Sequence, residues 1–100
     1  MPARAVFVIL IFIVTRLPAA AQVIRGEVLD MDDKHPVKGV SIENIYTSLD
    51  VVSGEQGAFI IAATGGQLLE FKKQGYKTTR VRIPQGYIPY FRIIMTHGIS

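Results

Sequence analysis

The sequence predicts an all-β domain, either a sandwich or a small barrel, built from about seven short strands. Two observations carry this prediction. After residue 22, apolar and polar residues alternate with a period of two in segment after segment, and turn-forming residues separate these segments at short intervals. A single domain is expected, because a chain of 100 residues leaves room for no more.

The first half of the mature chain contains four of the expected strands. Ile24, Gly26 and Val28 alternate with more polar neighbours, and Val40 with Ile42 repeat this pattern after a polar turn. Side chains on alternate positions of a strand point to opposite faces, so each set predicts one buried and one exposed face. The four strands expected here are residues 24–29, 40–43, 49–52 and 58–63.

The second half contains three more strands with the same alternation. Leu69 and Phe71 alternate with charged residues, and so do Val81 and Ile83. The strands expected here are residues 69–72, 79–83 and 91–95. Glycine, proline and polar residues mark five of the six turns between the seven strands, at residues 32–36, 53–57, 65–66, 74–75 and 84–86.

Residues 1–21 differ from the rest of the chain and predict a helical signal peptide. They hold 16 of the 49 apolar residues and none of the 8 acidic ones. Arg4 precedes an unbroken apolar run over residues 5–14, and three alanines end at Ala21, so cleavage is expected between Ala21 and Gln22. The alternative, a membrane anchor, is disfavoured because the run stops short of the roughly 20 apolar residues that a span needs. We therefore expect a mature chain that lies outside the cytoplasm and has no transmembrane span.

Charge excludes one class of function and leaves a question about the surface. The formal net charge is +3, but without residues 1–21 it falls to about +1, which argues against nucleic-acid binding. All the acidic residues lie before residue 71, and most of the basic ones follow. Complementary sheet surfaces are the favoured interpretation. The alternative is a basic face that meets an acidic partner or lipid headgroups, with Lys72, Arg80 and Arg82 among its residues.

No catalytic or cofactor site is predicted. The chain has no cysteine, and its serines lack the setting of a nucleophile. Its two histidines, His35 and His97, lie 62 positions apart without a zinc-binding pattern around either one. We therefore expect no enzyme activity, no cofactor and no metal site.

One loop and one aromatic segment leave alternatives open. Asp30, Asp32 and Asp33 precede His35, and this acidic loop is interpreted as a polar turn, with calcium binding undecided. Tyr87 and Tyr90 lie in an apolar segment that is expected to cap the core. Alternatively, the two tyrosines form a contact surface for a sugar or a peptide.

Four short motifs follow one another along the chain. They are GEVLD at residues 26–30, PVKGV at residues 36–40, EQGAF at residues 55–59 and GY at residues 75–76. In this order, directly behind a signal peptide, they resemble the carboxypeptidase regulatory-like domain. The sequence departs from the family at Ser53-Gly54, where an aspartate usually precedes the third motif, so no binding role of that aspartate is carried over.

The resemblance implies a seven-strand Greek-key β-sandwich of the transthyretin (prealbumin) type over residues 22–96, with a tail over residues 97–100. It also implies a non-catalytic, exported accessory or interaction domain of the cell envelope. The expected location is the periplasm, or the periplasmic face of the outer membrane, of a Gram-negative cell. The expected partner is an envelope protein or further domains of the same polypeptide.

Two alternative functions stay open. In one, the chain is the N-terminal domain of a TonB-dependent outer-membrane receptor for nutrient transport. In the other, it is an accessory domain of a periplasmic zinc carboxypeptidase.

Overall fold

The computed structural model describes residues 22–86 and 90–98, and over these residues all the regular secondary structure is β-strand. The seven strands are β1 (Gln22–Asp30), β2 (Ser41–Asn44), β3 (Leu49–Val52), β4 (Ala58–Ala63), β5 (Leu68–Lys72), β6 (Thr79–Arg82) and β7 (Phe91–Met95). They confirm the seven strands expected from the alternation. The expected signal peptide over residues 1–21, with Ala21, lies outside the described residues, and so does Tyr87.

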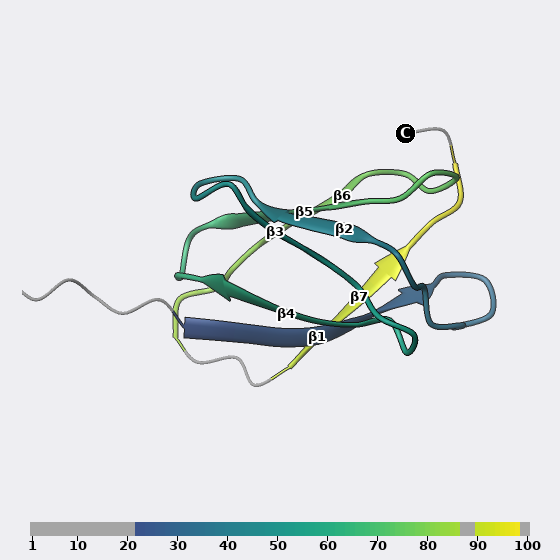
Figure 1. The fold of residues 1–100 in the computed structure, drawn as a ribbon, viewed down its shortest axis with the longest axis horizontal. Helices are drawn as coiled ribbons and strands as arrows, with labels where there is room; N and C mark the ends of the chain where they lie inside the picture. The colour runs from purple at the N-terminus through teal and green to yellow at the C-terminus, as the bar shows by residue number, and fades with distance from the viewer. Residues whose placement is uncertain (1–21, 87–89, 99–100) are drawn as a thin grey trace, which may run out of the picture.

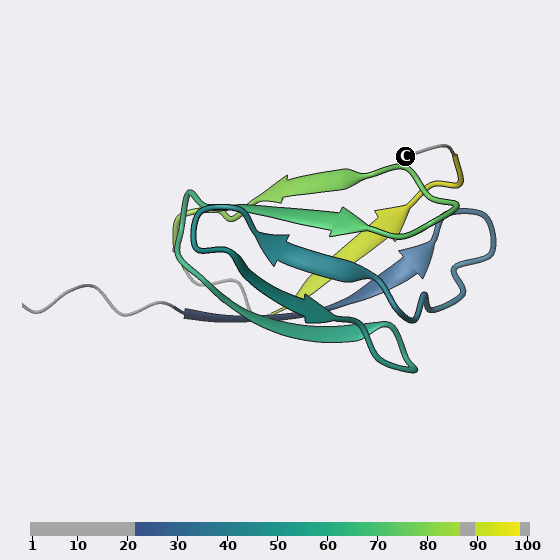
Figure 2. The same ribbon diagram turned by 45° about the horizontal axis from the view of Figure 1, so that its top comes forward.

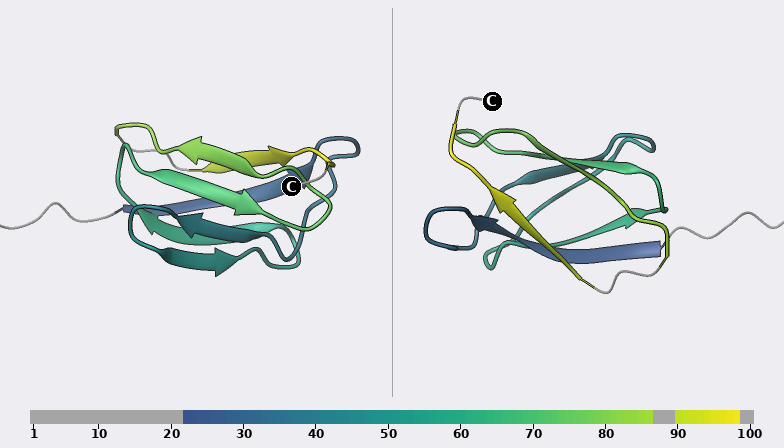
Figure 3. Two further views of the ribbon diagram at one scale, coloured as in Figure 1. Left: turned by 90° about the horizontal axis from the view of Figure 1, so that it is seen from above. Right: turned by 180° about the vertical axis from the view of Figure 1, so that it is seen from behind.

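The strands form two sheets that face each other as a sandwich (Figure 1). One sheet has three strands in the order β4-β1-β7, and the other has four in the order β3-β2-β5-β6. Neighbouring strands are antiparallel except for β1 and β7, which run parallel. Figure 2 and Figure 3 show the same two layers from other sides. The prediction of an all-β sandwich is thus confirmed, and a closed barrel is not formed.

The connections form a Greek key. Strands β2 and β3 pair as a hairpin, the chain then crosses to β4 in the other sheet, and β5 returns to lie beside β2. A fourth strand that returns beside the first is the defining feature of this motif. The parallel pair β1–β7 then joins the beginning of the described chain to its end.

The core fills the space between the two sheets. Inward positions follow the alternation in each strand, and Phe59 on β4 meets Phe71 on β5 edge to face, with ring centroids 5.4 Å apart. The contact joins the two sheets. The buried apolar residues are Ile24, Val28, Val37, Val40, Ile42, Phe59, Ile61, Ala63, Leu69, Phe71, Ile83, Ile93 and Met95.

Two glycines allow backbones to approach closely around β1. A Cβ atom on Gly26 would lie 2.4 Å from the carbonyl oxygen of Phe91 and 2.8 Å from the ring of Phe59. Gly57 has a φ of +72°, and a Cβ there would lie 2.5 Å from the carbonyl oxygen of Val28. The amide of Val28 donates to the carbonyl of Gly57 at 2.9 Å. Side chains are therefore excluded where β1 is contacted from both sides.

Ser53 joins two segments of the chain near the end of β3. Its hydroxyl is buried, accepts a hydrogen bond from the amide of Val40 at 2.9 Å and donates to the carbonyl of Val37 at 2.8 Å. It thereby ties the segment before β2 to the end of β3. The turn that follows is closed by backbone bonds, from the amide of Gly54 to the carbonyl of Ala58 and from that of Gly57 to Gly54.

Asn44 links the two sheets at the opposite end of β2. Its side-chain amide is fully buried and donates to the carbonyl of Ala62 on β4 and to Oε1 of Gln67, at 3.2 and 2.9 Å. Its Oδ1 accepts from the amide of Tyr46 at 3.0 Å. A buried amide is tolerated only when its polar atoms are paired, and here they are.

The close approach at Gly57 predicts a large effect of a single methyl group. Gly57→Ala forces a left-handed φ on alanine and a clash with the β1 backbone, so the free energy of unfolding should fall by about 2–4 kcal/mol. Urea denaturation measures this loss. The matched control is Gly54→Ala in the same turn, where a Cβ meets no atom within 4 Å and stability should be almost unchanged. Equal effects of the two substitutions would contradict the packing described here.

Candidate functional site

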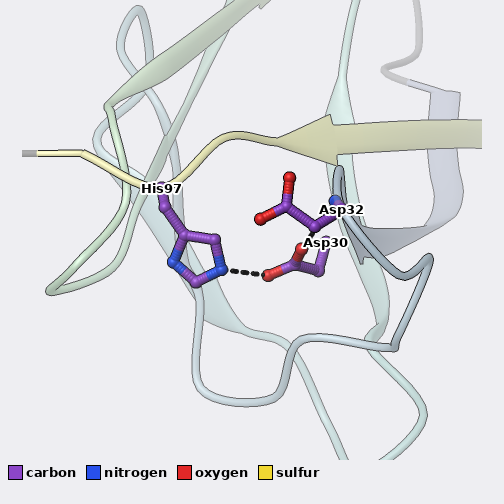
Figure 4. Close-up of side chains that lie close together, drawn as sticks. All are labelled: Asp30, Asp32 and His97. Carbon is purple, nitrogen blue, oxygen red and sulfur yellow. Dashed lines mark hydrogen bonds and ion pairs between the residues drawn. The ribbon is translucent and has the colours of Figure 1, made fainter.

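Polar side chains from three separate segments meet at one end of the sandwich. Asp30 is the last residue of β1, and Asp32 lies in the turn that follows it. Tyr76 lies in the loop between β5 and β6, and His97 lies just beyond the end of β7. Figure 4 shows Asp30 and Asp32 facing the imidazole of His97, which approaches them from the segment that follows β7. We call these four residues the loop-end cluster.

Asp30 is at the centre of the loop-end cluster. Its side chain occupies an inward position of β1 and is buried. Its Oδ2 accepts a hydrogen bond from the hydroxyl of Tyr76 at 2.7 Å and lies 2.6 Å from Nε2 of His97. Its Oδ1 accepts from the backbone amide of Asp32 at 2.8 Å. A carboxylate thus lies at an inward position where an apolar side chain is usual. Hydrogen bonds to both of its oxygens offset the cost of burying it.

These contacts shift two ionisation equilibria in opposite directions. The hydrogen bond from Tyr76, then that from the amide of Asp32, lowers the pKa of Asp30, with His97 adding to the effect and burial opposing it. The same bond to Asp30, together with burial, raises the pKa of Tyr76 to about 12. The bond therefore holds a carboxylate and a neutral phenol across the neutral pH range.

His97 is held against Tyr76 by its ring and by its backbone. The two rings stack with centroids 4.5 Å apart and an angle of 27° between their planes. An isolated β-bridge joins the two residues, and the amides of Lys77 and Gly98 donate to the carbonyls of Thr96 and Gly75. The chain beyond β7 is thus attached to the β5–β6 loop.

The loop-end cluster contains donor atoms of the kinds that bind metal ions. One ligand atom each from Asp30, Asp32 and His97 lie within 4.8 Å of one another. Asp30 is buried, whereas Asp32 and His97 are exposed. Two carboxylates and one imidazole are a mixed oxygen and nitrogen donor set, and they open toward solvent.

The acidic loop that the sequence singled out contributes only part of this cluster. Asp33 accepts a hydrogen bond from the amide of His35 within the turn, and neither residue belongs to the group of three metal-ligating side chains. Sequence analysis missed His97, which lies 67 positions after Asp30. Tyr76 was noted there only as part of the GY motif at residues 75–76. The parallel pairing of β1 with β7 brings His97 near Asp30, and a β-bridge to His97 brings Tyr76. Alternation alone does not reveal either pairing.

A second cluster of charges lies on the outer face of the four-stranded sheet. Glu70 on β5 is buried there, and its Oε2 accepts from Nε of Arg80 at 2.8 Å. The ammonium group of Lys72 lies 3.4 Å from its other oxygen. The bond from Arg80 is the largest cause of the lowered pKa of Glu70. Two of the predicted basic surface residues thus neutralise a carboxylate of their own sheet.

Two further basic residues, Arg82 and Arg92, are also in contact with their own chain. Arg82 donates to the carbonyl of Gly66 at 2.7 Å, and Arg92 on β7 donates to Glu27 on β1 at 3.2 Å. These contacts agree with the interpretation of complementary sheet surfaces. A partner-binding role of Lys72, Arg80 and Arg82 stays a prediction, as does that of Tyr90, whose residue surface is 51% exposed.

The described residues enclose no pocket. Every buried polar side-chain atom in this part of the chain has a hydrogen-bond partner. Among the same residues, no helix has the length and apolar character that crossing a membrane requires.

Comparison with known proteins supports the fold and nothing finer. No family model matches the chain, and no curated protein matches it. A chain in the crystal structure of a type II cohesin–X-dockerin complex from Acetivibrio cellulolyticus is similar, with a TM-score of 0.58 and 18% sequence identity. The TIE protein of Bacillus anthracis is similar at a TM-score of 0.54 and 12% identity. The similarity covers 74% and 78% of this chain, but only 56% and 17% of the two neighbours.

The hydrogen bond between Tyr76 and Asp30 predicts a stability loss with a defined pH dependence. Tyr76→Phe removes a donor from a buried carboxylate, so the melting temperature should fall by roughly 5–10 °C near pH 7. Because the pKa of Asp30 is lowered on folding, the wild-type advantage is complete well above the ordinary value of 3.8 and disappears as the pH falls below it. Because the pKa of Tyr76 is raised, the advantage is also lost as the pH rises from 10.0 through about 12.

Thermal denaturation followed by circular dichroism from pH 2 to pH 12 measures this difference. The control is Tyr46→Phe, at a tyrosine that is 61% exposed, where the melting temperature should stay almost constant. A Tyr76→Phe curve that stays parallel to the wild-type curve below pH 3 would contradict the role given to Asp30.

The contact between Glu70 and Arg80 predicts that charge reversal at neighbouring arginines has unequal effects. Arg80→Glu sets a second carboxylate against buried Glu70, whereas Arg82→Glu removes contacts only at an exposed site. The fall in melting temperature should be at least twice as large for Arg80→Glu, measured by thermal denaturation at low salt. Equal losses would show that Glu70 does not depend on Arg80.

Proposed function

We propose that this chain is a non-catalytic interaction domain that acts outside the cytoplasm and belongs with the carboxypeptidase regulatory-like domains. One observation carries the proposal: the motif residues occupy positions that a sandwich needs for its backbone or its core. Gly39, Gly57 and Gly75 have φ values of +78°, +72° and +90°, where other residues are strained. Phe59 is buried, and Tyr76 packs against the core.

Several polar groups make contacts that hold the fold together, which supports a non-catalytic role. Asp30 and Tyr76 bond to each other, and Glu70 is paired with Arg80 and Lys72. Residues engaged in this way hold segments together. Recognition of a partner would then belong to loops and strand edges.

One strand edge has the character of a contact surface. β3 is an edge strand of the four-stranded sheet, and it carries the exposed side chains of Leu49 and Val52. Ile45 and Tyr46, which are also exposed, lie in the turn before it. An edge strand also presents backbone amides and carbonyls with which an extended segment of a partner can pair. A solved neighbour comes from a complex of cohesin with dockerin, which is in keeping with a role in protein contact.

Export rests on the sequence of residues 1–21, and location and size can be tested together. Cells of the source organism are fractionated and blotted with an antibody raised against residues 22–100. A band of the mature size in the soluble periplasm is the expected result. Sequencing of its N-terminus should begin at Gln22.

Other bands would redirect or overturn the proposal. A much larger band in the outer membrane would favour the N-terminal domain of a receptor, and a larger soluble band would favour an accessory domain of a peptidase. A cytoplasmic band that retains residue 1 would contradict export. Interaction is tested separately by chemical cross-linking in the same cells. The control is the double variant Leu49→Lys with Val52→Lys on β3, which should keep the fold but lose any partner that is cross-linked to the wild type.

A further inference from the structure

The geometry points to a divalent metal site at the loop-end cluster, formed by Asp30, Asp32 and His97. The ion is of the zinc class, meaning zinc, nickel, cobalt or copper. This inference stands apart from the proposed function, because it uses neither the export signal nor the surface of β3.

The first step of the argument is the distance between the donor atoms. Around an ion with bonds of about 2.0–2.2 Å, neighbouring donor atoms lie about 3.0–3.5 Å apart. In the structure the three donor atoms lie within 4.8 Å of one another. His97 already contacts Asp30, and Asp32 is exposed, so we expect rotation of the Asp32 side chain to close this difference.

The second step is the way in which the fold holds two ligands, Asp30 and His97, and leaves the exposed side chain of Asp32 free to adjust. Asp30 is buried, and both of its oxygens are held, one by the hydroxyl of Tyr76 and one by the amide of Asp32. The imidazole of His97 is positioned by stacking on the Tyr76 ring at 4.5 Å. Hydrogen bonds to a carboxylate and stacking on an imidazole fix the orientation of these side chains toward each other. Tyr76 is therefore a positioning residue for both ligands.

The third step is the donor chemistry, which selects the class of ion. Calcium and magnesium take oxygen ligands almost exclusively. An imidazole nitrogen beside carboxylate oxygens instead favours zinc and its neighbours among the transition metals. Nε2 of His97 and Oδ2 of Asp30 lie 2.6 Å apart, so both atoms are close enough to contact one ion. Three protein ligands leave further coordination positions to water.

The fourth step is the local charge. Besides the two ligand carboxylates, Asp33 lies close enough to add to the negative potential that Tyr76 experiences. The exposed residues Asp32 and Asp33 have no salt bridge within the described chain. A cation thus enters a site of net negative charge that faces solvent.

The test is isothermal titration calorimetry of the purified protein with zinc chloride, beside a calcium chloride titration. The expected result is saturable binding of one zinc ion per chain, with no binding of calcium. Asp32→Asn should weaken zinc binding at least tenfold, and His97→Ala should abolish it. The matched control is His35→Ala, which removes the other histidine from the neighbouring turn and should leave the affinity within twofold of the wild type.

Two safeguards keep the result decisive. The first is circular dichroism at the titration temperature, which confirms that each variant is folded. The second is Asp32→Asn, which replaces His97→Ala as the test variant if the latter does not fold. The Asp32 side chain makes no hydrogen bond or ion pair within the described residues, so its substitution should not disturb the fold. Zinc binding that is absent, or that survives both Asp32→Asn and His97→Ala, would overturn the proposal. Loss of binding in His35→Ala would move the site to the acidic turn and would overturn it as well.

Discussion

The close packing of backbones around β1 is the constraint on which the rest of the sandwich depends. Gly26 has no side chain, and the ring of Phe59 and the carbonyl of Phe91 occupy the space where one would lie. Two residues along, Val28 donates its amide to Gly57 and accepts at its carbonyl from the amide of Val37. One strand thus fixes β4, β7 and two loops at once. The position of Asp30, at the next inward site of the same strand, is a consequence of this arrangement.

Pairing of strands that are distant in the sequence also brings its acidic first part into contact with its basic last part. The acidic first part and the basic last part would repel within themselves if each formed its own sheet. Instead β1 lies beside β7, so Glu27 meets Arg92, and β5 lies beside β6, so Glu70 meets Arg80. Glu43 on β2 lies directly across from Glu70 on β5. Like charges at opposed positions destabilise a sheet, and Arg80 offsets this cost for the buried partner.

Local patterns predicted the strands well, because each strand's alternation is visible in its own residues. The turn glycines were also predictable, since a positive φ at Gly39 or Gly57 favours the residue found there. The loop-end cluster was not predictable, because Tyr76 and His97 lie 46 and 67 positions from Asp30 and only strand pairing brings them together. In the sequence, Asp33 and His35 are as plausible ligands as Asp32. Only the structure shows that Asp32 lies beside Asp30 and His97, whereas Asp33 bonds to the amide of His35 within the turn.

The loop-end cluster is more polar than a purely structural joint requires. An apolar residue at position 30 would continue the inward alternation of Ile24 and Val28, and a well-packed apolar group in place of a buried ionic contact is often neutral or stabilising. The chain instead places a carboxylate there, which must then be satisfied by Tyr76, His97 and a backbone amide. Two of the polar side chains that surround it remain exposed to solvent. A joint that served only to hold three segments together would have no need of these exposed donors, so the arrangement fits a site that presents them to a ligand.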